Sequence, residues 1–174
     1  MVFDAGPVPV QLREVGADEV SVLQELIEAD PGYTERITGH PPGASDALSL
    51  LMMRPEGVTE DAKLVLGAWD GAALVGVVDL VRGYPDSRCA FVGLLQVRWE
   101  LQRGGVGRAV WAAAESWLRR AWPEVERVRL AVVDTNEVPA ARFWAAVGFR
   151  PTGEYRPYRY DKLASTTRFW EKPL

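Results

Sequence analysis

The chain has 174 residues, 48% of them hydrophobic and 25% charged, a composition and length typical of one globular domain that spans 1–174. The net charge of −4 argues against nonspecific binding of nucleic acid. With one cysteine (Cys89), one histidine (His40), no signal-peptide pattern and no membrane-length apolar run, we expect a cytoplasmic protein without a disulfide, metal site or membrane partner.

The first half of the chain predicts a strand, two helices and a hairpin. Asp30-Pro31-Gly32 is expected to end the first helix. Asp70-Gly71 joins two apolar runs and is a strong hairpin signal. The expected elements are a strand over 10–15, a helix over 18–29, a helix that begins at Ser45 or Asp46, and strands over 63–69 and 72–81.

The second half changes from a strand period to a helical one and back. A strand is expected over 89–97, a helix that ends before Pro123, a strand over 128–133 and a helix over 139–147. Gly148 follows as a left-handed cap, the chain is extended from Phe149 onward as a sixth strand, and the last strand covers 166–171. The strand, helix and strand over 89–133 predict a parallel crossover. Seven strands and four helices indicate an α/β fold, α+β in some schemes, around a mixed, mostly antiparallel twisted sheet.

A glycine-rich turn over 97–108 separates an apolar strand from a long helix. Glycines let an anion approach the backbone, and the first N–H groups of a helix lack partners, so a phosphate fits there. Arg103 and Arg108 add charged donors. The alternative is a turn whose glycines only allow close packing of helix and strand.

Two common phosphate motifs fit this turn less well. A P-loop needs lysine and a hydroxyl residue after its second glycine, and Gly107 is followed by Arg108-Ala109. A dinucleotide fingerprint needs a third glycine or alanine where Val110 stands. A nucleotide- or dinucleotide-binding protein of another class therefore stays an alternative, but the turn favours it less.

The motif Gln102-x-x-Gly105-x-Gly107, preceded by Leu95-x-Val97, resembles the coenzyme A signature of the GNAT superfamily of N-acetyltransferases. A second landmark follows in the same order as in that family. It consists of Asn136, the aromatic pair Phe143-Trp144 and Gly148-Phe149. The resemblance covers roughly 8–155.

This resemblance implies acetyl-CoA as the acyl donor and a splayed pair of central parallel strands. The backbone of Leu95 and Val97 would bind the pantetheine arm, Asn136 would contact it, and Phe143 would pack near the coenzyme. Gln102 belongs to the same binding motif. The pyrophosphate would lie on the N–H groups of Arg103, Gly104, Gly105, Val106, Gly107 and Arg108.

The usual catalytic side chains of the family are missing. Trp144 occupies the place of a tyrosine acid, and Phe91 that of a glutamate base. Asp79 interrupts an apolar strand, and antiparallel pairing would place it across from Gly93, near the thioester, as a replacement base. The alternative is an exposed position at the open edge of the sheet. Four tyrosines are equal candidates for the acid: Tyr33, Tyr84, Tyr155 and Tyr158.

The charges are unevenly distributed along the chain. The segment 1–62 holds 12 acids and 3 bases, a balance of −9, and the rest of the chain carries +5. In the resembled family the first two helices shape the acceptor site, so this balance fits a cationic amine: a polyamine, an aminoglycoside-like compound or a protein lysine. Ordinary scatter of solvated charges is the alternative.

The missing tyrosine and glutamate also favour a second interpretation, a module that binds acyl-CoA without transfer. Cys89 is expected in the core and His40 at the surface, although a substrate contact by His40 is an alternative. Trp111 and Trp117 lie on the predicted helix, and either is a candidate for the contact of a homodimer.

Overall fold

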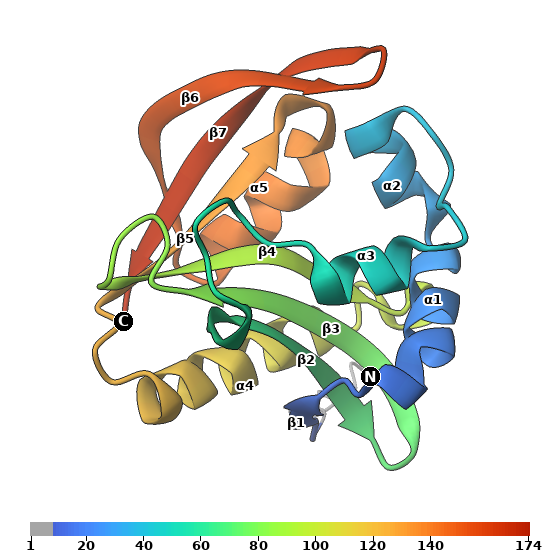
Figure 1. The fold of residues 1–174 in the computed structure, drawn as a ribbon. Helices are drawn as coiled ribbons and strands as arrows, with labels where there is room; N and C mark the ends of the chain where they lie inside the picture. Colours follow the sequence, from blue (N-terminus) through green and yellow to red (C-terminus); the bar gives the residue numbers. More distant parts are fainter. Residues whose placement is uncertain (1–8) are drawn as a thin grey trace, which may run out of the picture.

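The computed structural model describes residues 9–174 and has a twisted seven-stranded sheet at its centre (Figure 1). The strand order is β1-β2-β3-β4-β5-β7-β6, and only β4 and β5 are parallel neighbours. The strands are β1 Gln11–Glu14, β2 Lys63–Asp70, β3 Ala73–Arg82, β4 Cys89–Val97, β5 Arg127–Val133, β6 Arg150–Tyr160 and β7 Leu163–Pro173. The predicted mixed, mostly antiparallel sheet is confirmed.

The described residues form five α-helices, one more than predicted. They are α1 Val20–Glu28, α2 Pro31–Thr38, α3 Asp46–Met52, α4 Val106–Ala121 and α5 Glu137–Ala146. The additional helix is α2, because Pro31 is its first residue and not part of a terminating loop. Proline is favoured at this position, where its missing N–H would have no partner and its fixed φ is already helical.

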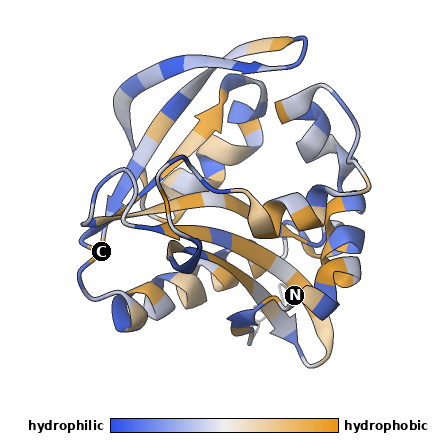
Figure 2. Ribbon diagram, viewed as in Figure 1, coloured by the Kyte–Doolittle hydropathy of each residue, from blue (hydrophilic) through white to orange (hydrophobic). Residues whose placement is uncertain are grey.

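Helices cover both faces of the sheet. On one face α1 and α3 pack on β2 and β3 through a cluster that includes Leu23, Ala47 and Val77. On the other face α4 and α5 pack through a larger cluster with Trp111 and Trp144. Figure 2 shows the apolar residues concentrated along the central strands, whereas the β6–β7 hairpin is largely hydrophilic. The hydrophobic core therefore lies on both faces of strands β2 to β5.

The parallel pair at the centre of the sheet separates after four residues. Cys89–Val92 of β4 pair with Arg127–Leu130 of β5, and no pairing continues beyond them. From there β4 stays with β3 up to Val97, and β5 stays with β7 up to Val133. Each strand keeps one paired edge and leaves the other free, so the predicted splay is present.

A bulge in β4 lies at the point where the strands separate. Asp79 pairs with Leu94 and Leu80 with Val92, so Gly93 has no partner on β3. The expected pairing of Asp79 with Gly93 is wrong by one residue, because a bulge inserts an extra residue that hydrophobic alternation does not reveal. A β-carbon on Gly93 would collide with the Asp79 carboxylate, which explains a glycine there.

Candidate functional site

The glycine-rich turn leaves its backbone N–H groups free. Arg103 and Gly105 have positive φ angles of 63° and 85°, and α4 starts directly afterwards at Val106. Residues 102–105 form a turn, but among residues 9–174 no backbone N–H from Arg103 to Arg108 makes a well-aligned hydrogen bond to a backbone carbonyl. Such a run of outward N–H groups at a helix start favours an anion.

The two motif glycines in this turn have different physical reasons. A β-carbon on Gly105 would meet nothing within 4 Å, so its positive φ is what favours glycine there. A β-carbon on Gly107 would lie 3.1 Å from Cε2 of Phe143, so this glycine allows α4 and α5 to pack closely. Close packing thus explains the glycine at 107. It does not explain the glycine at 105.

The free edge of β4 presents the backbone of Leu95 and Val97. The Arg98 N–H donates to Val75 O at 2.9 Å, beside the pair of Val97 with Gly76. In an antiparallel ladder this geometry marks a pair that is not itself hydrogen-bonded, and such pairs alternate along the strand. The N–H and C=O groups of Leu95 and Val97 therefore point away from β3, toward the side where β5 has separated.

Gln102 fastens the turn to its surroundings. Its Nε2 donates to Val97 O at 3.1 Å and to Oδ2 of buried Asp30, just before α2, at 2.9 Å. On the opposite side of the splay, Oδ1 of buried Asn136 accepts a hydrogen bond from Arg36 Nε at 2.7 Å. Both polar side chains of the predicted motif thus bind the helix pair α1–α2, a link that sequence reasoning missed.

Asp79 is buried and paired with Lys63. The two side chains are 8% and 7% exposed, with Lys63 Nζ 2.6 Å from Asp79 Oδ1, so the alternative of an exposed edge position is wrong. Burial raises the pKa of the Asp79 carboxyl, and the Lys63 ammonium opposes part of that shift. The carboxylate lies directly behind Gly93, and its assignment as base stays a prediction.

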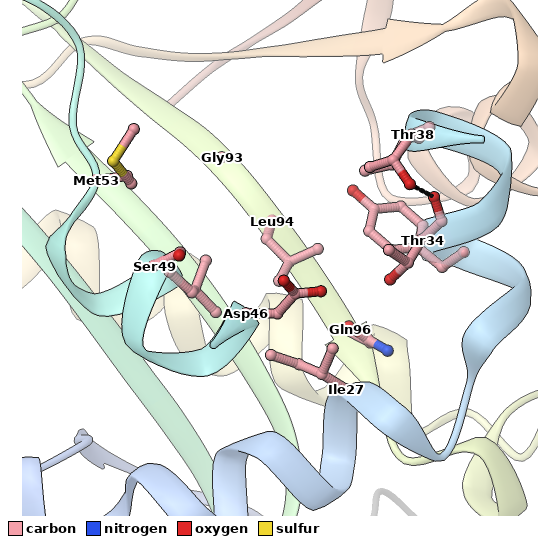
Figure 3. Close-up of a pocket in the computed structure, with 12 residues that line it drawn as sticks. Ile27, Thr34, Thr38, Asp46, Ser49, Met53, Gly93, Leu94 and Gln96 are labelled. Carbon is pink, nitrogen blue, oxygen red and sulfur yellow. Dashed lines mark hydrogen bonds between the residues drawn. The ribbon is translucent and has the colours of Figure 1, made fainter. Parts of the chain in front are cut away.

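A cavity of about 280 Å³ lies between α2, α3 and β4 (Figure 3). Its polar lining residues are Tyr33, Thr34, Thr38, Asp46, Ser49 and Gln96, and its remaining lining residues are Ile27, Ile37, Leu50, Met53, Gly93 and Leu94. Gly93 and Leu94 belong to the bulge of β4, so the cavity reaches the point where the central strands separate.

Two lining residues stand out for their polar groups. Gln96 is 5% exposed, and its Nε2 has no hydrogen-bond partner within the described part of the chain. Tyr33 is the one tyrosine candidate that lines the cavity, and burial raises its pKa to about 12. Gln96 was missed in the sequence, although a glutamine that interrupts the apolar run 89–97 is the same signal that identified Asp79.

The other three tyrosine candidates lie elsewhere. Tyr84 packs edge-on against Phe91, with ring centroids 5.5 Å apart, and Tyr155 is largely exposed. The Tyr158 hydroxyl donates to Ile37 O at 2.6 Å. Since none of them lines the cavity, the structure leaves Tyr33 as the best-placed phenol.

The aromatic residues of α4 and α5 form a packed cluster. Trp144 contacts Trp111, Phe143 and Phe149 with centroids 5.0–5.7 Å apart, so it stabilises the core and supplies no acid. Trp111 is 1% exposed, so the alternative that it makes a dimer contact is wrong. Phe143 lies against Gly107 at the start of α4, and its expected contact with the coenzyme stays a prediction.

The surroundings of Cys89 and His40 indicate structural roles for both residues. Cys89 is fully buried, and burial raises the pKa of its thiol to about 11, which suits a small core residue. His40 is exposed, with Nε2 2.8 Å from Asp161 in the β6–β7 hairpin. In residues 9–174 no group of three or more His, Cys, Asp or Glu side chains could hold a metal ion. No helix in this range is long and apolar enough to cross a membrane.

Comparison with known proteins places this geometry in context. A sequence model of the acetyltransferase (GNAT) family matches residues 25–149, and no curated protein matches the chain. The structure is similar to an acetyltransferase from Thermus thermophilus, with 23% identity, TM-score 0.73 and coverage of 97% of this chain and 99% of that chain.

Two further solved structures share the fold. One is the ribosomal-protein-S18-alanine N-acetyltransferase from Escherichia coli, with 14% identity, TM-score 0.66 and coverage of 95% of this chain and 94% of that chain. The other is a GCN5-related N-acetyltransferase from Kribbella flavida, with 20% identity, TM-score 0.63 and coverage of 95% and 98%. At these identities the likeness extends to the fold alone.

Proposed function

The chain belongs to the acetyltransferase (GNAT) family, whose members transfer an acyl group from acetyl-CoA, and we propose that this protein is an N-acetyltransferase for a primary amine. The observation that carries the proposal is the run of unpaired N–H groups from Arg103 to Arg108 beside the free edge of β4. We further propose that it works as a single domain in the cytoplasm, where a lone buried thiol such as Cys89 stays reduced.

The coenzyme would lie along the splay between β4 and β5. Its pyrophosphate would accept hydrogen bonds from the turn over 103–108, and its pantetheine arm would pair with the backbone groups of Leu95 and with the Val97 N–H, which point away from β3. Asn136 is on the opposite side, where its amide would contact the same arm. Gln102 holds the turn in place through Val97 O and Asp30.

The reaction exchanges one bond at the acetyl carbon. The neutral amine nitrogen attacks the thioester carbonyl carbon, a C–N bond forms, the C–S bond breaks, and the sulfur leaves as a thiolate that takes up a proton. The nitrogen must also release one proton. The cavity between α2, α3 and β4 reaches the bulge of β4, so an amine bound there would meet a thioester held along β4.

We assign the two proton transfers to Asp79 and Tyr33. Asp79 would accept the proton of the amine through water, because burial raises its pKa and its carboxylate lies next to Gly93, which lines the cavity. Tyr33 would protonate the thiolate, since it is the one tyrosine candidate that lines the cavity. Alignment of amine and thioester supplies a further part of the rate.

The test is steady-state acetylation of a panel of amines with detection of free thiol. We expect saturable thiol release with at least one amine and thermal stabilisation by acetyl-CoA. Stabilisation by acetyl-CoA with no turnover for any amine would favour the alternative, a module that binds acyl-CoA without transfer. That alternative is supported by Trp144 and Phe91, which replace the usual acid and base with side chains that cannot donate or accept the proton.

A further inference from the structure

The residues that line the cavity beside the bulge indicate the chemistry of its ligand, in addition to what the size of the cavity indicates. Gln96 places its amide at the β4 wall, 5% exposed, and its Nε2 has no hydrogen-bond partner within residues 9–174. A buried polar group without a partner costs free energy, so such groups are rare in native proteins, and each one calls for an explanation such as a water, an ion or a ligand. A ligand that pairs with Gln96 Nε2 must therefore offer a hydrogen-bond acceptor.

The charge of the lining limits the charge of the ligand. Asp46 of α3 is the one ionisable carboxylate among the lining residues, and the lining contains no arginine or lysine. Figure 3 shows its carboxylate directed from α3 into the space that Thr34 of α2 and Gln96 of β4 also border. One of its oxygens accepts a hydrogen bond from the Gly43 N–H at 3.0 Å. A single carboxylate matches a single ammonium group and leaves the further charges of a polyamine or aminoglycoside without partners.

The shape of the cavity favours a compact ligand. Its volume of about 280 Å³ is at the lower limit of the range for small-molecule pockets. The α2 wall is fastened to the β6–β7 hairpin by Tyr158, whose hydroxyl binds Ile37 O at 2.6 Å, and by the His40–Asp161 pair at 2.8 Å. These contacts hold the α2 wall of the cavity against the β6–β7 hairpin.

We infer that the acceptor is a compact small-molecule amine with one positive charge, an apolar body and one uncharged oxygen-bearing group, and that Gln96 selects it by binding that oxygen. This inference rests on the proposed function and narrows its acceptor. It replaces the polyamine, aminoglycoside and protein lysine suggested by the acidic balance of 1–62, because that charge lies mostly outside the cavity lining.

The test compares leucinamide with isoamylamine, which has the same branched apolar body and amine but no amide. We define the leucinamide advantage as the ratio of kcat/KM for leucinamide to kcat/KM for isoamylamine at one pH. We expect this advantage to be larger in the wild type than in Gln96→Leu and Gln96→Met by about tenfold or more, as for one buried hydrogen bond. Spermidine and a tetrapeptide that begins with leucine should be poorer than leucinamide. The part of the ratio that remains in the two variants reflects the lower amine pKa of leucinamide, and the KM for acetyl-CoA should be unchanged in both. The control Gln11→Leu, at an exposed position of β1, should keep the advantage.

Two results would overturn the inference: an unchanged leucinamide advantage in both Gln96 variants, or a wild-type preference for spermidine or the tetrapeptide. If no amine is acetylated, the proposed function fails, but the inference about the cavity is still decided by binding. With coenzyme A present, leucinamide should then raise Tm more than isoamylamine in the wild type and equally little in Gln96→Leu. Equal shifts in the wild type would refute it.

Discussion

Replacing Lys63 with methionine would leave the Asp79 carboxylate buried without its counter-charge. Both side chains are less than a tenth exposed and 2.6 Å apart, so solvent screens the pair little. Removal of one partner from a buried pair costs about 3–5 kcal/mol of unfolding free energy. At about 2–4 °C per kcal/mol for a chain of this size, we expect Tm of Lys63→Met to fall by roughly 6–20 °C.

The loss of unfolding free energy in Lys63→Met should increase with pH. Burial raises the pKa of Asp79 above its usual 3.8, and the Lys63 ammonium opposes this rise, so the variant raises the folded-state pKa further. The folded variant then binds more protons than the unfolded chain above pH 3.8. Its stability is therefore fully present below that pH and falls as pH increases through the folded-state pKa.

The assay is urea unfolding of Lys63→Met and of the double variant Lys63→Met/Asp79→Leu across a pH series. Removal of both charges should recover most of the loss and abolish its pH dependence. A loss below about 1 kcal/mol at neutral pH, the range of an exposed ion pair, would refute the reasoning, because it would mean that water reaches the carboxylate in the folded protein.

Three further predictions concern the coenzyme turn and the cavity. Gly105→Ala should raise the KM for acetyl-CoA and lower the unfolding free energy by about 1–2 kcal/mol, because the φ of 85° at Gly105 disfavours a β-carbon. The control Gly104→Ala, at a position without a positive φ, should change both quantities little. Equal effects of the two variants in thermal unfolding and kinetics would contradict this. Tyr33→Phe should lower kcat by about 10²-fold or more with the KM for acetyl-CoA unchanged, and a change below twofold would remove Tyr33 as the acid. Gln96→Leu should stabilise the free protein by about 1–3 kcal/mol in urea unfolding, because it removes an unpartnered buried amide; a loss of stability would show that the amide has a partner.

Most of the fold could be predicted from local patterns. The hairpin at Asp70-Gly71, the strand before the glycine-rich turn and the helix that ends before Pro123 are each specified by neighbours within a few residues, and all are present. The helix α2 was missed for a related reason. Pro31 ends one helix and begins another, and only the downstream packing of α2 against its neighbours distinguishes a helix start from a loop.

The residues proposed to bind the coenzyme were predictable because they follow one another along the chain. Backbone N–H groups at a strand-to-helix turn depend on local φ angles, and those of Arg103 and Gly105 have the positive values that a glycine-rich turn suggests. The proposed acceptor site was not predictable in this way, since Tyr33, Asp46 and Gln96 come from three elements far apart in sequence.

The sequence by itself therefore determined the order of elements, the parallel crossover and the turn with free amides, because each depends on hydrophobic period and turn chemistry over short distances. Tertiary structure alone decided that Asp79 is buried against Lys63, that Gly93 forms a bulge, and that Gln96 faces the cavity without a partner. Burial and pairing depend on which surfaces meet across the sheet, and one residue of register, which a bulge changes, decides which side chains come into contact.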